Sequence, residues 1–127
     1  MTMNAKAGTG KKGEDEACLY LMREGHTIIA RNWRGGHGEM DIVSLDGKGL
    51  HFVEVKTRRA PVAADPEVNV DAAKRRHLIK TAHLFLMSPE GRPLADCETF
   101  FDVLTVVFED ETTYIQYYPQ AFIPIYD

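Results

Sequence analysis

The sequence has few cysteines, no long apolar run and, after Arg92, no lysine or arginine. Its two cysteines, Cys18 and Cys97, lie far apart and form no CxxC pair, which argues against a disulfide framework and against a cysteine zinc site. No apolar run approaches the ~18 residues of a membrane-spanning helix. The polar segment 1–12 lacks the apolar stretch of a signal peptide, so we expect a cytoplasmic protein.

The charge is distributed unevenly along the chain. The net charge of −4 disfavours a nucleic-acid partner at first sight. Seven acidic residues follow Arg92, namely Asp96, Glu98, Asp102, Glu109, Asp110, Glu111 and Asp127. The first 92 residues therefore hold all 15 basic residues against 12 of the 19 acids, a balance of +3. This asymmetry permits a modest basic face.

The remaining composition is that of an ordinary globular domain, with 44% hydrophobic and 27% charged residues in 127. The histidines are scattered, as His26, His37, His51, His77 and His83. No two of them show a recognised metal-ligand spacing, so we interpret each as a surface or packing residue.

Hydrophobic periodicity predicts the element order α-β-β-β-α-β-β. The expected helices span 13–25 and Asn69 or Asp71 to Met87, and the expected strands span 27–30, 39–45, 50–56, 99–108 and 113–118. Residues 31–38, which contain three glycines, are predicted to form a loop, as are 57–68, and 46–49 a hairpin turn. A right-handed crossover would make strands 50–56 and 99–108 parallel. We therefore expect an α/β fold, a mixed sheet flanked by helices, with a flexible arm at 1–12 and a single domain at 13–127.

The candidate chemistry lies on the two central hairpin strands. Alternate residues of a strand share a face, so Glu54 and Lys56 point the same way, as do Glu39 and Asp41. If these faces coincide, carboxylates and one ammonium converge, and such oxygen ligands suit Mg²⁺ or Mn²⁺. Phosphodiester hydrolysis uses this combination, with Asp41 and Glu54 as metal ligands and Lys56 contacting water or phosphate. A surface ion-pair network is the alternative interpretation.

Glu14 is a further candidate. It continues the inward stripe of the first predicted helix, one turn before Cys18. A glutamate there either reaches a polar site or is stabilised by the helix dipole, and the residues alone leave both interpretations open.

Several segments, in order from about residue 10 to residue 108, resemble the YraN-like proteins. They are Gly13-Glu14, Ala17, Tyr20-Leu21, Gly25, Ala30 to Arg34, Gly38 to Val43, Phe52 to Arg58, Val70-Asp71 with Lys74, and Phe101 to Val103. The chain is identified on these motifs as a member of that family, of which 52–58 is the most specific stretch.

The family in turn resembles archaeal Holliday junction resolvases and the wider PD-(D/E)xK nucleases. That resemblance implies a restriction-endonuclease-like αβββαβ core and a Mg²⁺- or Mn²⁺-dependent endonuclease acting on DNA, with branched DNA or repair intermediates as candidate substrates. Asp41 would be the motif's aspartate, Glu54 and Lys56 its (D/E)xK pair, and Glu14 the helix-one glutamate of the resolvases. Glu39 belongs to the family's own signature and is a candidate accessory residue. Two positions depart from the pattern: Met40 replaces the motif's proline, and Phe100 replaces a common arginine.

Basic residues near these motifs are candidate phosphate contacts, because backbone neutralisation dominates nucleic-acid affinity. They are Arg34, Arg58, Arg59, Lys74 and Arg75. Trp33 is expected to pack in the core. No base-reading motif is present, which favours recognition of DNA structure over sequence. Two alternatives stay open: a non-catalytic nucleic-acid-binding module, and an interaction protein that contacts a repair or replication complex through residues 96–127. Resolution of a symmetric substrate would need a homodimer.

Overall fold

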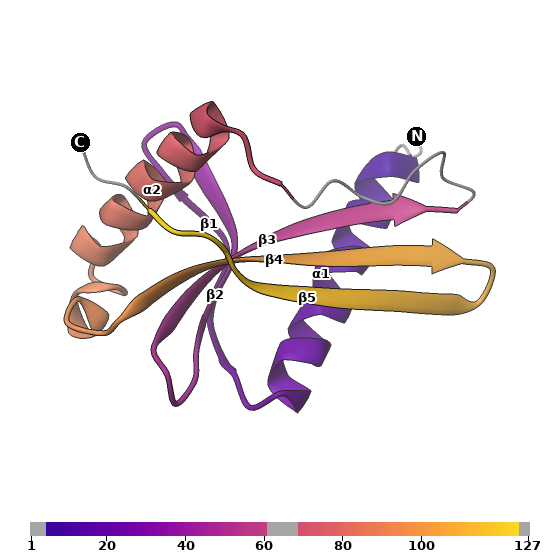
Figure 1. Ribbon diagram of the computed structural model, residues 1–127, viewed down its shortest axis with the longest axis horizontal. Coiled ribbons are helices and arrows are strands. Elements are labelled where there is room, and N and C mark those ends of the chain that lie inside the picture. Colours follow the sequence, from indigo (N-terminus) through magenta and orange to yellow (C-terminus); the bar gives the residue numbers. More distant parts are fainter. Residues whose placement is uncertain (1–4, 61–68, 125–127) are drawn as a thin grey trace.

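The computed structural model describes residues 5–60 and 69–124, and side chains from residue 10 onward within those ranges. Its elements are α1 (Ala5–Arg23), β1 (Thr27–Gly35), β2 (Gly38–Leu45), β3 (Leu50–Arg59), α2 (Ala72–Met87), the 3₁₀ turn η1 (Arg92–Leu94), β4 (Thr99–Glu109) and β5 (Thr112–Phe122). Figure 1 shows one sheet with a helix on either side. The predicted α/β fold with a mixed sheet flanked by helices is confirmed.

The sheet has five strands in the order β1-β2-β3-β4-β5. All neighbours pair antiparallel except β3 and β4, which are parallel, as a crossover through α2 requires. β3 is therefore central, and the predicted parallel pairing of these two strands is confirmed. A central strand buried on both faces is a rigid support for a site.

Each face of the sheet carries its own hydrophobic core. On β3, Phe52 packs in the core beneath α2 with Phe85, while Val53 packs in the core beneath α1 with Leu21. Alternation continues along β3, so Glu54 follows Phe52 onto the α2 face. The hydrophobic sequence of β3 thus fixes which face its later, charged residues occupy.

The start of α2 is well defined by its sequence. Asp71 is the N-cap, and its carboxylate accepts a hydrogen bond from the Lys74 backbone N–H at 2.8 Å. Such a cap contributes about 1 kcal/mol to stability. It fixes the first turn of the helix, and with it Lys74, above β3. The helix ends at Met87, as the sequence predicts, with Ser88 as its C-cap.

Four element boundaries lie three or more residues from the prediction, and one of them is the end of β5, which runs to Phe122 instead of residue 118. α1 begins at Ala5, so the predicted start at Gly13 is too late and residues 5–12 of the predicted arm are helical. β1 runs to Gly35, so the predicted loop at 31–38 is wrong. Trp33 pairs with Met40 of β2 and packs edge-on against Phe85, with ring centroids 5.3 Å apart, and this burial outweighs the local glycine signal. β3 continues to Arg59, and 61–68 of the predicted loop lie outside the described residues.

The expected core packing of Trp33 is confirmed. Within the described residues, neither helix combines the length and the apolar character needed to cross a membrane.

Candidate active site

The hydrogen-bonded ladder between β2 and β3 ends early, and the candidate site begins where it ends. The last paired residues are Ile42 and Val53. Beyond them, the backbone N–H of Val55 donates to the carboxylate Oδ2 of Asp41 at 2.8 Å. The Asp41 side chain thus takes the place of a strand carbonyl, which leaves the carboxylate between the two strands instead of on one face.

Glu54 and Lys56 lie on the α2 face of β3 and line one cleft. The cleft has a volume of about 490 Å³ and is lined by residues 54–58, residues 69–71 and Lys74. Only 14% of the Glu54 side chain is exposed, and its Oε2 lies 3.2 Å from the Lys74 Nζ. A largely buried carboxylate in the lining of the cleft thus has an ammonium from α2 beside it.

Asp41 and Glu54 are close enough to perturb one another. Burial, together with the hydrogen bond and the negative charge of Glu54, raises the pKa of Asp41 from 3.8 to about 8. Two ionised carboxylates in one semi-buried place repel one another strongly. Either one of them keeps its proton, or a cation binds between them. The predicted convergence of Asp41 with Glu54 is therefore seen in the structure.

Glu14 approaches the same point from α1. Its charge contributes to the raised pKa of Asp41. The approach depends on Gly13, because a Cβ atom there would lie 2.0 Å from Oγ1 of Thr57 on β3. The missing side chain lets α1 contact β3 closely and brings Glu14 toward the gap between β2 and β3.

We expect Gly13→Ala to lower the free energy of unfolding by about 1–3 kcal/mol, because the helix and the strand must separate to admit the methyl group. Gly10 is a matched control in the same helix, where an added Cβ meets nothing within 4 Å. Gly10→Ala should raise stability by up to about 1 kcal/mol through helix propensity. Chemical denaturation measures both changes, and equal effects would contradict the close-contact role of Gly13.

Glu39 is not brought to this site. Its carboxylate lies 3.6 Å from the Arg34 guanidinium, and its side chain is 41% exposed. Neither residue is among those that line the cleft.

The other candidate phosphate contacts fall into two groups. Arg58 lines the cleft, with its guanidinium 2.8 Å from the Thr57 carbonyl, and Lys74 lies beside Glu54. Arg59 packs over the ring of Phe108 instead, 5.7 Å from its centroid. Arg75 is exposed on α2, next to Lys74 in sequence. Only part of the predicted set therefore lies at the cleft.

Sequence reasoning missed a second polar cluster. His26 and His51 are buried against Asp46, whereas His37, His77 and His83 are exposed. The available signal was the hairpin turn, which brings Asp46 near the start of β3. The contribution of His26 depends on tertiary packing and carries no local signature.

Residues 13–106 match the model of the family described as "Uncharacterised protein family UPF0102". The chain belongs to this family. The expected membership of the YraN-like proteins is thereby confirmed. The matched stretch contains Glu14, Asp41, Glu54 and Lys56.

UPF0102 proteins from several bacteria are similar to this chain. That of Nitratidesulfovibrio vulgaris (strain DP4) is 39% identical, covering 94% of this chain and 87% of its own length. That of Geobacter metallireducens is 40% identical, with coverage of 89% and 90%. That of Bacteroides thetaiotaomicron is 37% identical, with coverage of 91% and 92%. Among solved structures, the chain is similar to Hjc, a Holliday junction resolvase from Archaeoglobus fulgidus, with a TM-score of 0.47, 17% identity, and coverage of 86% and 75%.

Proposed function

We propose that this UPF0102 protein is a metal-dependent endonuclease that hydrolyses phosphodiester bonds in DNA. One observation carries the proposal: Asp41 and Glu54 meet where β2 and β3 separate, beside a cleft lined by Lys56. Carboxylates paired in this way, with an ammonium at hand, are what metal-assisted phosphodiester hydrolysis requires.

The donor set fits a hard divalent cation. Asp41 and Glu54 offer carboxylate oxygens, which Mg²⁺ and Mn²⁺ prefer. The raised pKa of Asp41 supports this assignment, because a cation would relieve the repulsion that now favours a proton. Asp41 and Glu54 would hold the ion, with Glu14 nearby. The ion, when bound, supplies polarisation of a phosphoryl oxygen and activation of a water.

Lys56 is the residue that would act on the reacting groups. It lies on the same face of β3 as Glu54 and lines the same cleft. Its ammonium can donate hydrogen bonds to the attacking water or to a phosphoryl oxygen that gains charge in the transition state. Lys74 balances the charge of Glu54 and supplies a second cation for the scissile phosphate.

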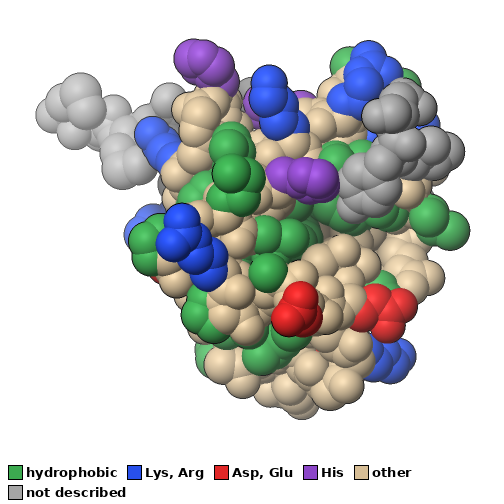
Figure 2. Space-filling model, turned by 90° about the vertical axis from the view of Figure 1, so that its left-hand side faces the viewer, with side chains coloured by type: hydrophobic (Ala, Val, Ile, Leu, Met, Phe, Trp, Pro, Cys, Tyr) green, Lys and Arg blue, Asp and Glu red, His purple; other side chains and the backbone are tan. Residues whose placement is uncertain are grey.

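The surface of α2 supports nucleic acid as the substrate. The helix contains no acidic residue, and Lys74, Arg75, Arg76 and Lys80 are all exposed on it. Three of these cations lie within its first turns, where the helix dipole disfavours positive charge and backbone N–H groups favour an anion. Figure 2 shows Lys and Arg side chains gathered mainly in the upper half of the face on which α2 lies. These residues would bind the phosphate backbone, which favours selection of DNA structure over base sequence.

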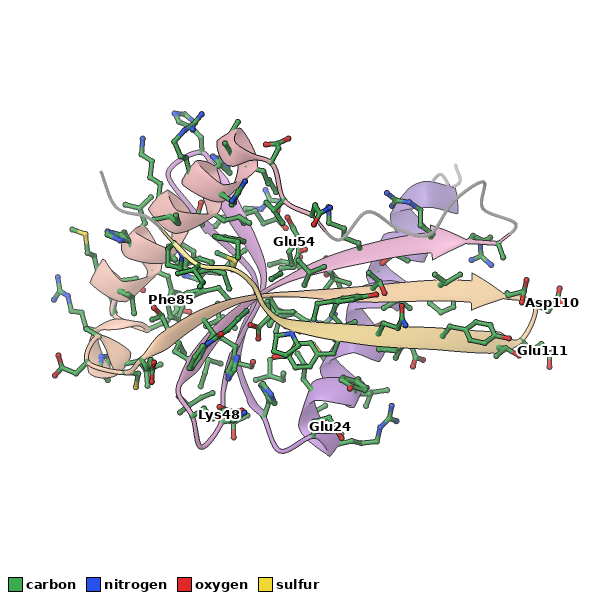
Figure 3. All side chains as sticks on the ribbon, in the orientation of Figure 1. Glu24, Lys48, Glu54, Phe85, Asp110 and Glu111 are labelled. Atoms are coloured by element: carbon green, nitrogen blue, oxygen red, sulfur yellow. The ribbon has the colours of Figure 1, made fainter. Side chains whose placement is uncertain are left out.

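The proposal is tested by cleavage of labelled duplex, single-stranded, flap and four-way-junction DNA, with Mg²⁺, with Mn²⁺ and with a chelator. We expect the wild type to cut only with metal and Lys56→Ala to cut at least ~10²-fold more slowly. Lys48→Ala is the matched control, because Lys48 lies in the turn between β2 and β3, away from Glu54 (Figure 3). This control should retain the wild-type rate.

Each other outcome assigns the protein differently. Salt-sensitive DNA binding with no product from any substrate would replace the enzyme by a non-catalytic binding module. Negligible DNA affinity at low salt would favour an interaction protein. The surface in question would then be the acidic turn at Asp110 and Glu111, which lies at the far end of β4 and β5 from Glu54 (Figure 3).

A further inference from the structure

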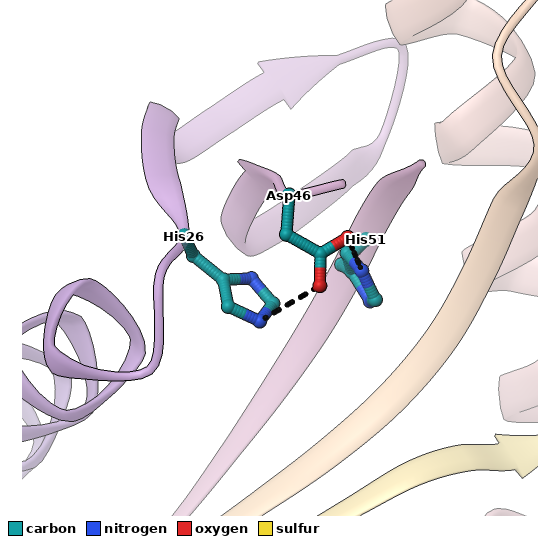
Figure 4. Close-up of side chains that lie close together, drawn as sticks. All are labelled: His26, Asp46 and His51. Atoms are coloured by element: carbon teal, nitrogen blue, oxygen red, sulfur yellow. Dashed lines mark hydrogen bonds and ion pairs between the residues drawn. The ribbon is translucent and has the colours of Figure 1, made fainter. Parts of the chain in front are cut away.

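His26, Asp46 and His51 form a second cluster away from the cleft. His26 follows α1, Asp46 lies in the turn between β2 and β3, and His51 lies on β3. Figure 4 shows the Asp46 carboxylate with one oxygen directed at each imidazole. Neighbours of the cluster in sequence, Glu24 and Lys48, both lie toward the lower edge of the view in Figure 3, away from Glu54.

The three side chains present their ligand atoms at metal-binding separations. The Nε2 of His26 lies 3.5 Å from one Asp46 oxygen, and the Nε2 of His51 lies 2.8 Å from the other. One ligand atom from each residue can be chosen so that all lie within 4.8 Å of one another. Ligands of a tetrahedral Zn²⁺ at its usual bond lengths are ~3.3 Å apart, so a small contraction would close the site.

The second nitrogen of each imidazole is already held. The Nδ1 of His51 lies 2.7 Å from the Asp102 carboxylate, and the Nδ1 of His26 lies 2.9 Å from the Ser44 hydroxyl. Asp102 is itself fixed by the Tyr117 hydroxyl and the Gln120 backbone N–H. Metal-binding histidines have such outer partners, which orient the ring and direct the other nitrogen at the ion.

Charge balance also favours a divalent cation here. The cluster buries two carboxylates, with Asp102 fully buried and Asp46 18% exposed. A divalent ion between the two imidazoles offsets both of these negative charges.

The geometry points to a Zn²⁺ site formed by His26, Asp46 and His51, with Asp102 and Ser44 as outer partners. Two nitrogen ligands and one oxygen suit Zn²⁺ better than Mg²⁺. Three protein ligands leave a position for water. The ion joins the end of α1 to the hairpin of β2 and β3, so it stabilises the fold and is separate from the nuclease cleft.

The test titrates untagged, chelator-treated protein with Zn²⁺ against a chromophoric chelator. We expect one Zn²⁺ per chain, a loss of affinity of more than ~100-fold in His26→Gln, and a loss of ~10–100-fold in Asp102→Asn. His77→Gln controls for an exposed imidazole, and Glu111→Gln controls for an exposed carboxylate. Both controls should bind Zn²⁺ like the wild type.

NMR of the unaltered protein provides a test that does not depend on variants folding. Zn²⁺ should shift the ring signals of His26 and His51 and leave those of the exposed His37 and His77 in place. Three results would overturn the site: no stoichiometric binding, unchanged affinity in folded His26→Gln, or shifts confined to exposed histidines. The cluster would then be a buried ion-pair network only.

Discussion

Asp41→Asn is expected to lower metal-dependent DNA cleavage by more than ~10³-fold while the fold is retained. The variant removes an anionic ligand, and losing ~4 kcal/mol of transition-state stabilisation corresponds to a factor of that size. Asparagine keeps a carbonyl oxygen that can accept a hydrogen bond from the Val55 N–H, so the contact between β2 and β3 at this point is retained. The measurement is kcat/KM on the best substrate of the panel at saturating metal, with circular dichroism as the check of folding.

Glu111→Gln is the matched control for that experiment. It also removes one carboxylate, but at the exposed turn between β4 and β5 (Figure 3). Cleavage by this variant should match the wild type. Equal cleavage by folded Asp41→Asn and wild type would remove Asp41 from the site. A large loss in both variants would point to overall charge instead of metal binding.

Most of the fold follows from local sequence signals. The apolar start of β3, the Asp71 cap and the Ser88 end of α2 predict a strand and a helix where the structure has them. The crossover between β3 and β4 then dictates their parallel pairing. These features depend on periodicity and capping, which short stretches of sequence express directly.

The boundaries that sequence missed depend on tertiary contacts. β1 continues through glycine-rich sequence because the Trp33 ring packs against that of Phe85, a residue more than fifty positions away. Packing of this kind overrides local turn signals, and no window of neighbouring residues contains it. The same limit hid the contribution of His26, which lies twenty residues before Asp46 in the chain.

Strand alternation predicts the placement of the candidate site residues on β3 but not on β2. Alternation along β3 placed Glu54 and Lys56 together. On β2, however, Met40 packs beneath α2 and Ile42 beneath α1, although residues two apart in a regular strand share a face. Asp41 lies at this irregularity and is directed between the strands. Its contact with the Val55 N–H could not be derived from a two-residue repeat.

Without divalent cations, the stability of the wild type is expected to fall as pH rises from about 4 to 8, more steeply than that of Asp41→Asn. The pKa of Asp41 is 3.8 in its ordinary state and about 8 in the fold. Between these pH values the folded chain holds a proton that the unfolded chain has released. Each unit of rising pH therefore lowers the free energy of unfolding by up to ~1.4 kcal/mol. Asparagine has no proton to lose, and we expect the variant to be more stable by about 2 kcal/mol or more at pH 8.

Urea denaturation across this pH range measures the difference, with Glu111→Gln as a control that should keep the wild-type slope. The comparison with Asp41→Asn is necessary because His51, whose pKa is raised by its two carboxylate partners despite burial, also loses stabilisation as pH rises.

Mg²⁺ at pH 8 should stabilise the wild type and leave Asp41→Asn nearly unchanged, since only the former retains the charged pair. Parallel pH profiles for wild type and Asp41→Asn would mean that the two carboxylates do not share a proton. If the two pH profiles differ but Mg²⁺ has no effect on stability, Asp41 and Glu54 do repel one another but do not form a metal site. A site that loses stability to hold Asp41 beside Glu54 and regains it from a cation is what the nuclease proposal requires.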